Sequence, residues 1–119
     1  MKIDDEGKLL RIFVGESDKF HSRPLFEALV EKAKEIGMAG STVLRGIEGF
    51  GANSRIHTAK ILRLSEDLPV LIEIVDSDER IKEALPVFEN MINESKCGVL
   101  MTLERVEIIK YTSGKELGE

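Results

Sequence analysis

The chain has 119 residues, of which 42% are hydrophobic and 33% are charged, a composition typical of one folded domain rather than a disordered segment. Its formal net charge of −5 argues against DNA or RNA as the main partner, because phosphate backbones are bound by a dominant positive field. Cys97 is the single cysteine, which excludes a disulfide framework and a zinc site built on cysteines. The acidic N-terminus lacks the apolar segment of a signal peptide, and no apolar run approaches the ~20 residues that span a bilayer, so we expect a cytoplasmic protein.

The N-terminal part of the chain predicts a strand followed by a helix. Residues 8–15 are apolar and rich in β-forming side chains, which indicates a buried strand. Residues 16–21 are polar and predict a loop. Ser22 is a candidate helix cap, and Pro24 is tolerated in the first helical turn. Apolar residues then recur at helical spacing, namely Leu25, Leu29, Ala33 and Ile36.

Two strands are predicted in the middle of the chain, on either side of a long connection. Residues 41–47 form the first of them, in which Gly46 indicates a bulge or a close backbone approach. Residues 70–75 form the second. Alternation divides this second strand into two faces, one with Val70, Ile72 and Ile74 and the other with Leu71, Glu73 and Val75.

The C-terminal part predicts a second helix and a final sheet segment. We expect Asp76 to start the helix, with Glu79 three residues later completing a capping-box-like pair. The core stripe of this helix consists of Ile81, Leu85, Phe88 and Ile92. Pro86 falls inside the stripe and should kink or split the helix, because it removes one backbone hydrogen bond. Residues 99–111 are rich in β-branched side chains and predict one or two strands.

This order of elements, βαββαβ, predicts an α+β fold of the ferredoxin-like kind. In such a sandwich a four-stranded antiparallel sheet carries two helices on one face. No linker divides the chain, so we expect residues 1–119 to form a single domain. Residues 1–7 and 112–119 are predicted to be flexible tails.

The stretch between the two middle strands is the strongest candidate site. A connection of ~20 residues exceeds the usual length, which itself suggests a function. It begins with a glycine-rich turn that contains Gly46, Gly49 and Gly51, whose spacing matches neither a dinucleotide fingerprint nor a Walker A loop. Successive backbone N–H groups in such a turn can bind an anion, and nearby basic residues would add positive charge. A strand bulge followed by a solvated loop is the alternative interpretation.

Several segments resemble PII signalling proteins. The sequence Gly-Phe-Gly at 49–51, a short polar and basic stretch, and then His57-Thr58 resemble the start of the PII T-loop. Residues 68–75 look like the PII strand that follows this loop, and residues 110–115 look like the PII C-terminal segment. The closer match is to the PII-like family long catalogued as a domain of unknown function. Its members carry stretches similar to residues 16–18, 44–51 and 54–58.

The resemblance implies a ferredoxin-like homotrimer that regulates another protein and is not an enzyme. It implies an adenine nucleotide in the cleft between subunits, near the base of a loop at about residues 46–66. This loop would change conformation with the ligand and signal to a partner, often a membrane transporter or an enzyme. The nucleotide-binding residues implied on this chain are Arg45, Gly46, Gly49, Phe50, Gly51, Asn53, Arg55, His57 and Lys110.

The sequence also departs from the PII pattern in ways that bear on the ligand. The loop has one residue more between Gly51 and His57, and it lacks the tyrosine that is modified in PII. Residues 93–98 are short and lack the glycine-rich phosphate-binding run. These departures favour AMP or ADP over ATP and argue against sensing of 2-oxoglutarate.

Two other functions compete with nucleotide sensing. One is a metal-binding trimer like the CutA relatives of this fold, with His57 or His21 as ligand, although two histidines without tight spacing imply no definite metal site. The other is a structural trimer without a ligand. A small enzyme is the weakest alternative, because the sequence shows no nucleophile–base pattern and its carboxylate pairs lie where caps and turns are expected.

Overall fold

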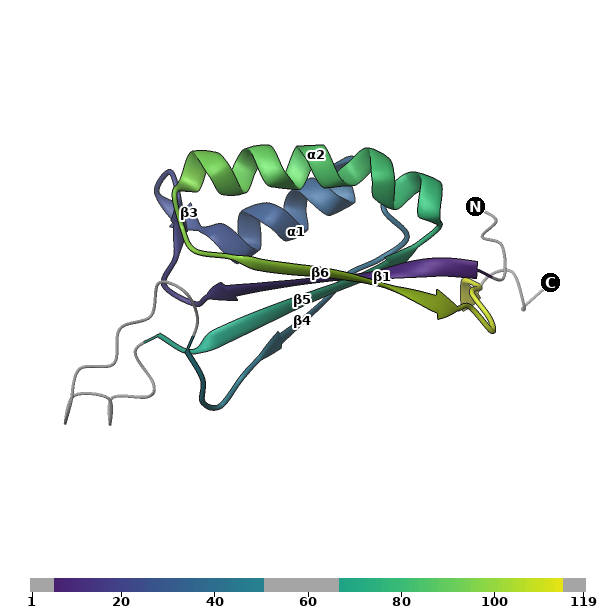
Figure 1. Ribbon diagram of the computed structural model, residues 1–119, viewed down its shortest axis with the longest axis horizontal. Coiled ribbons are helices and arrows are strands. Elements are labelled where there is room, and N and C mark those ends of the chain that lie inside the picture. Colours follow the sequence, from purple (N-terminus) through teal and green to yellow (C-terminus); the bar gives the residue numbers. More distant parts are fainter. Residues whose placement is uncertain (1–5, 51–66, 115–119) are drawn as a thin grey trace.

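A four-stranded antiparallel sheet with two helices on one face forms the body of the protein. The computed structural model describes residues 6–50 and 67–114 (Figure 1). In spatial order the strands are β4 (Thr42–Arg45), β5 (Pro69–Asp76), β1 (Glu6–Gly15) and β6 (Leu100–Glu107). The helices are α1 (Leu25–Glu35) and α2 (Asp78–Ser95). The predicted ferredoxin-like arrangement is therefore confirmed. Neither helix of the described residues is long and apolar enough to cross a membrane.

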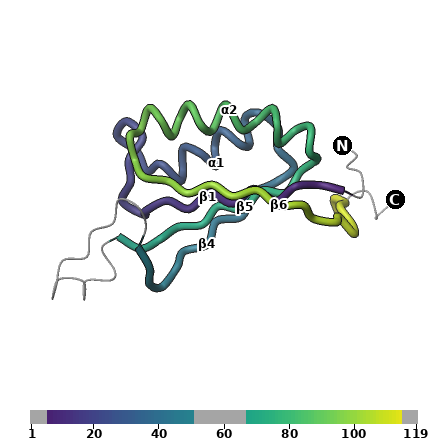
Figure 2. The backbone as a smooth tube through the Cα atoms, in the orientation of Figure 1, coloured from purple at the N-terminus to yellow at the C-terminus, as the bar shows by residue number. Residues whose placement is uncertain are grey.

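The core lies between the helices and the two central strands. β1 and β5 pair antiparallel along eight positions, with Ile12 opposite Ile72. Both isoleucines are fully buried, as is Phe88 of α2. Because the side chains of a strand alternate, the residues between these buried positions point to the other face of the sheet. No helix of the described residues covers that face (Figure 2). The predicted division of β5 into a buried and an outward face is confirmed.

Three predicted segment boundaries differ in the structure. Glu6 and Gly7 are not part of a tail, because they extend β1 and pair with Glu107 and Val106 of β6. Glycine suits position 7, since a Cβ atom there would lie 2.8 Å from the Asp76 carbonyl oxygen. The segment 99–111, predicted to form one or two strands, contains one strand, β6, which runs from Leu100 to Glu107. The strand predicted at 41–47 ends earlier, at Arg45.

The first helix begins without the predicted serine cap. α1 starts at Leu25, its N-cap is Pro24, and no side chain caps it. The Leu25 N–H donates instead to the Asp18 carbonyl oxygen, at 2.8 Å. Residues 19–24, expected to be loop and cap, contain a short antiparallel ladder in which β2 (Lys19–Phe20) pairs with β3 (Arg23–Pro24). Ser22 is exposed and lies in the turn between the two strands of this ladder.

The second helix differs from its prediction at two positions. Its N-cap is Ser77, whose hydroxyl oxygen accepts a hydrogen bond from the Arg80 N–H at 3.3 Å. Asp76, the predicted start, instead ends β5 and is completely buried. Pro86 does not split α2, which continues from Asp78 to Ser95. Both Pro86 and Lys82 are exposed, so water can solvate the Lys82 carbonyl that the proline leaves without a partner.

Truncating the central aromatic residue tests this description of the core. Phe88→Ala should lower the free energy of unfolding by about 3–5 kcal/mol, since it leaves a cavity between α2 and the sheet. Urea denaturation followed by circular dichroism measures the change. Glu89→Ala, at the exposed neighbouring position, is the control and should change stability little. Equal effects of the two substitutions would contradict this packing.

Candidate functional site

A cavity of about 410 Å³ lies where β4 begins and the chain beyond β6 folds back on the sheet. It is lined by Ala39, Gly40, Ser41, Thr42, Glu73, Val75, Ile108, Lys110 and Tyr111. The lining combines one ammonium group, one carboxylate, three hydroxyl groups and three aliphatic side chains. The carboxylate, that of Glu73, is paired with Arg11 at 3.0 Å. Such a mixture can bind a ligand that has both an anionic end and an apolar or aromatic part.

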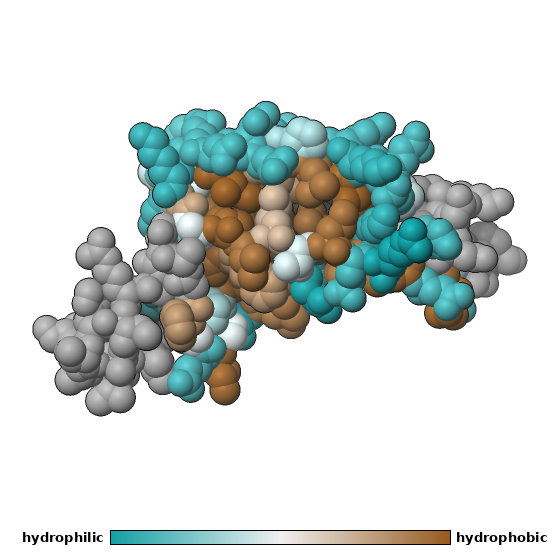
Figure 3. All heavy atoms as spheres, viewed as in Figure 1, coloured by the Kyte–Doolittle hydropathy of each residue, from teal (hydrophilic) through white to brown (hydrophobic). Residues whose placement is uncertain are grey.

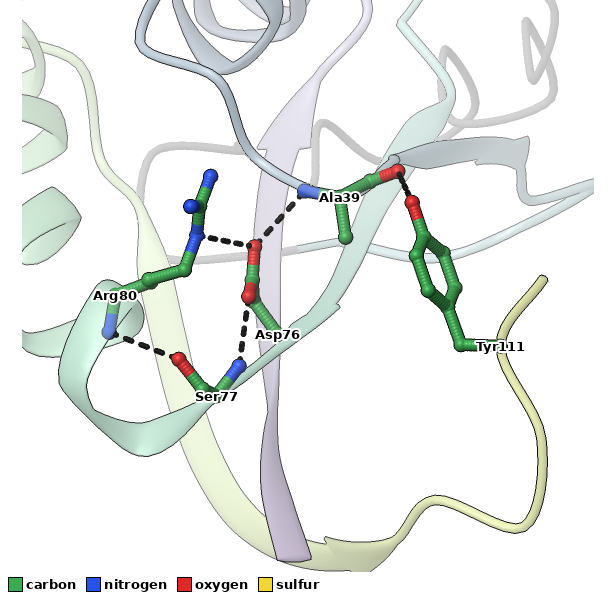
Figure 4. A network of polar contacts seen from close by, with 5 residues as sticks. All are labelled: Ala39, Asp76, Ser77, Arg80 and Tyr111. Carbon is green, nitrogen blue, oxygen red and sulfur yellow. Dashed lines mark hydrogen bonds and ion pairs between the residues drawn. The ribbon is translucent and has the colours of Figure 1, made fainter. Parts of the chain in front are cut away.

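One wall of the cavity is fixed by the buried carboxylate of Asp76 (Figure 4). The backbone N–H of Ala39 donates to Asp76 Oδ2 at 2.8 Å, and that of Ser77 donates to Oδ1 at 2.7 Å. The Arg80 guanidinium adds a contact of 3.3 Å to Oδ2 and supplies the opposite charge. The carboxylate is thus both paired and hydrogen-bonded, which burial of a charge requires. It joins the end of β5, the start of α2 and the turn between α1 and β4.

The opposite wall is attached to the same turn. The Tyr111 hydroxyl donates to the Ala39 carbonyl oxygen at 2.9 Å. Ala39 is therefore held on one side by Asp76 and on the other by the segment that follows β6 (Figure 4). The shape of the cavity depends on these two hydrogen bonds between side chains and the Ala39 backbone.

Removing the charge of Asp76 should destabilise the protein and loosen the cavity wall. In Asp76→Asn the amide nitrogen would face a backbone N–H, so we expect the free energy of unfolding to fall by about 2–4 kcal/mol. Urea denaturation provides the measurement. Glu79→Gln makes the same chemical change at an exposed position in the first turn of α2 and should have a small effect. A stability of Asp76→Asn equal to that of the wild type would show that the carboxylate is not needed as an acceptor.

The glycine turn lies at the other end of β4. Gly46 follows the strand, and its N–H donates to the Pro69 carbonyl oxygen at 2.7 Å. A Cβ atom at position 46 would lie 2.8 Å from Pro69 Cγ, and one at position 49 would lie 3.0 Å from it. The close backbone approach predicted for Gly46 is therefore present, and Pro69 is the group approached. Phe50 is exposed.

The described part of the chain contains five of the nine predicted nucleotide-binding residues. Gly51, Asn53, Arg55 and His57 lie outside the described residues. Arg45, Gly46, Gly49 and Phe50 lie together at and beyond the end of β4, whereas Lys110 lines the cavity at the opposite end of the sheet (Figure 1). Within one copy of the chain the structure does not bring these two groups together.

Sequence reasoning missed the roles of Asp76 and of the turn that precedes β4. The signal for Asp76 was present, because positions 70, 72, 74 and 76 share one face of an alternating strand. The competing signal, an acidic residue just before a helix, suggested a cap. No local pattern marks Ala39, which becomes part of a site only through residues distant in sequence.

The described residues offer little support for a metal centre. Within residues 6–50 and 67–114, no group of three or more His, Cys, Asp or Glu side chains is arranged to hold a metal ion. His21 is exposed, and its Nε2 lies 2.9 Å from Glu94 Oε2. His57, the other predicted ligand, lies outside the described residues.

The uncovered face of the sheet carries exposed leucines on both edge strands and one cluster of charged side chains. Leu44 of β4 and Leu100 of β6 are 48% and 58% exposed. Between them Arg11 of β1 binds Glu73 at 3.0 Å and Glu104 at 2.6 Å. Figure 3 shows apolar side chains gathered along the side of the molecule that carries β6, below the polar surface of α2.

Comparison with known proteins identifies the family. Residues 7–108 match the family model DUF190, described as "Uncharacterized ACR, COG1993". The chain belongs to the DUF190 family. This DUF190 chain is 42% identical over 102 residues to a UPF0166 protein of Aquifex aeolicus, with 86% of this chain and 92% of the relative covered. It is also 36% identical over 90 residues to the UPF0166 protein MJ1524 of Methanocaldococcus jannaschii, with coverage of 76% and 82%.

Solved structures show that this DUF190 protein shares the fold of PII-like proteins. CPII from Thiomonas intermedia K12, a nitrogen regulatory PII-like protein, superposes with a TM-score of 0.64 when bound to ADP and bicarbonate. The alignment covers 88% of this chain and 90% of CPII at 15% identity. A second structure of CPII, bound to ADP, AMP and bicarbonate, gives a TM-score of 0.61 at 14% identity. The resemblance to the PII-like family stated from the sequence is confirmed.

Proposed function

We propose that this DUF190 protein is a cytoplasmic, homotrimeric regulator that binds an adenine nucleotide, with AMP or ADP favoured over ATP. The observation that carries the proposal is the cavity of about 410 Å³ with Lys110 on its wall. Its size falls within the range of small-molecule sites, about 300–1,000 Å³. Support also comes from CPII, a protein of the same fold that has been solved with ADP and AMP.

The cavity offers a complementary group for each part of a nucleotide. The aliphatic side chains of Val75 and Ile108 suit a purine ring, and the hydroxyls of Ser41 and Thr42 suit ribose or base atoms. Lys110 is exposed and forms no ion pair with another described residue, so its ammonium group is available to a phosphate.

A second copy of the chain would complete this site. Residues 45–50 and Lys110 lie at opposite ends of the sheet, so one ligand can touch both groups only across a subunit boundary. The uncovered sheet face, with exposed Leu44 and Leu100, gives such a copy an apolar surface to cover. A homotrimer joined through this face would place the glycine turn of one subunit toward the cavity of the next.

The loop of residues 46–66 is the proposed signalling arm. Its residues 51–66 lie outside the described residues, and its glycine turn would contact the nucleotide. A ligand bound there would favour one arrangement of the loop, which a partner such as a membrane transporter or an enzyme would recognise. In this proposal the protein acts by binding and catalyses no reaction.

Titration calorimetry with AMP, ADP and ATP tests the nucleotide site. The wild-type protein should bind AMP or ADP more tightly than ATP. Lys110→Gln should weaken ADP binding about tenfold, because a charged hydrogen bond to phosphate is lost. Lys34→Gln, an exposed lysine of α1, is the matched control and should bind as the wild type does. Failure of the wild-type protein to bind any of the three at millimolar concentration would contradict the proposal.

The assembly is tested separately by sedimentation equilibrium. Leu44→Glu should convert trimers to monomers, since it places a charge on the face proposed to be buried between subunits. Circular dichroism should be unchanged, because Leu44 lies outside the core of the single chain. Leu44→Met keeps the apolar surface and should remain trimeric. A wild-type protein that sediments as a monomer would exclude the intersubunit site.

A further inference from the structure

The turn after β1 contacts the chain on both sides of residues 51–66. The outgoing side is the end of β4, and the returning side is the segment that leads into β5. On the returning side, the Glu16 N–H donates to the Leu68 carbonyl oxygen at 2.8 Å, and the Ser17 N–H donates to Asp67 Oδ1 at 3.1 Å. On the outgoing side, the guanidinium of Arg45 forms an ion pair with the carboxylate of Glu16. One residue, Glu16, therefore contacts both ends, the first through its backbone and the second through its side chain.

The two contacts differ in what could break them. On the returning side, backbone N–H groups donate to Leu68 and Asp67. A dissolved anion is not a hydrogen-bond donor, so it cannot replace these groups. The outgoing side is held by a single ion pair between Glu16, whose side chain is 25% exposed, and Arg45, whose side chain is 63% exposed. An anion that approaches from solvent can reach the guanidinium while the carboxylate stays in place.

Arg45 is the single basic residue among the described residues adjoining this stretch, 42–50 and 67–69. The surrounding charge is negative. Burial raises the pKa of the Asp18 carboxyl, the Gly15 N–H that donates to it lowers that pKa, and the charge of Asp67 raises it further. Within these described residues, Arg45 alone can supply a positive charge to a bound phosphate.

We infer that Glu16 competes with the phosphate of a bound nucleotide for Arg45, so that ligand binding detaches the end of β4 from the turn after β1. A guanidinium binds carboxylate and phosphate with the same paired N–H donors and cannot give its full set to both. The inference rests on the proposed function, because it requires a nucleotide phosphate near residues 45–50. In this inference Glu16 is a positioning residue that lowers the affinity for phosphate. The ligand is thereby coupled to one end of the loop only, the end that contains Arg45.

Binding measurements on charge-neutral variants test this competition. Glu16→Gln should raise the affinity for ADP about two- to fivefold, the range expected for release of a partly exposed ion pair. The affinity for adenosine, which has no phosphate, should be unchanged. Arg45→Gln should weaken ADP binding, and adding Glu16→Gln to it should give no further gain.

Glu48→Gln is the matched control, because it removes the same charge from an exposed position in the glycine turn that follows Arg45. A general electrostatic effect would raise ADP affinity equally in Glu48→Gln and Glu16→Gln and would overturn the inference. It would also be overturned by a gain that persists in the Arg45→Gln background or appears equally with adenosine. A wild-type protein that binds none of the nucleotides would overturn the proposed function and this inference together. ADP binding by the wild type without a gain in Glu16→Gln would overturn the inference alone.

Discussion

The alternation of side chains along β5 divides this protein into a closed face and an open face. Val70, Ile72 and Ile74 point toward the helices and form the core with β1. Glu73 and Val75 point the other way, onto a face that no described helix covers, and both line the cavity. A one-residue slip of this strand would exchange the two faces, so the core and the candidate site are specified by the same register.

The last inward position of β5 links the core to the site. Asp76 follows Ile74 on the closed face, but its carboxylate accepts hydrogen bonds from three donors that belong to two separate elements. Since these donors come from the turn before β4 and from the start of α2, the carboxylate determines where both elements meet the sheet. The fold itself therefore fixes the wall of the cavity that contains Ala39.

The sequence predicted the elements that repeat a regular pattern and missed those that depend on distant contacts. The two faces of β5 followed from alternation, and the glycine at 46 correctly indicated a close approach. The ladder between β2 and β3 has only two residues in each strand, too few for any periodic signal. Asp76 was misassigned because an acidic residue before a helix is compatible with a cap, and only packing shows that Ser77 takes that role.

The candidate site could be predicted only in part for a related reason. Lys110 was named from a family resemblance, and the structure places it on a cavity wall. Ala39 and Tyr111 lie 72 positions apart in the chain, so no local pattern could indicate that they share a hydrogen bond. The separation of Lys110 from residues 45–50 also emerges only in three dimensions, and it is the reason the account requires a second subunit.

A crystal structure of the protein grown with ADP tests the central claim most directly. The account predicts a trimer with the purine in the cavity formed by Val75, Ile108 and the turn before β4. The phosphates should lie between Lys110 of one subunit and residues 45–50 of its neighbour. A structure with ADP bound elsewhere, such as on the helical face, or with the cavity facing no second subunit, would contradict the account.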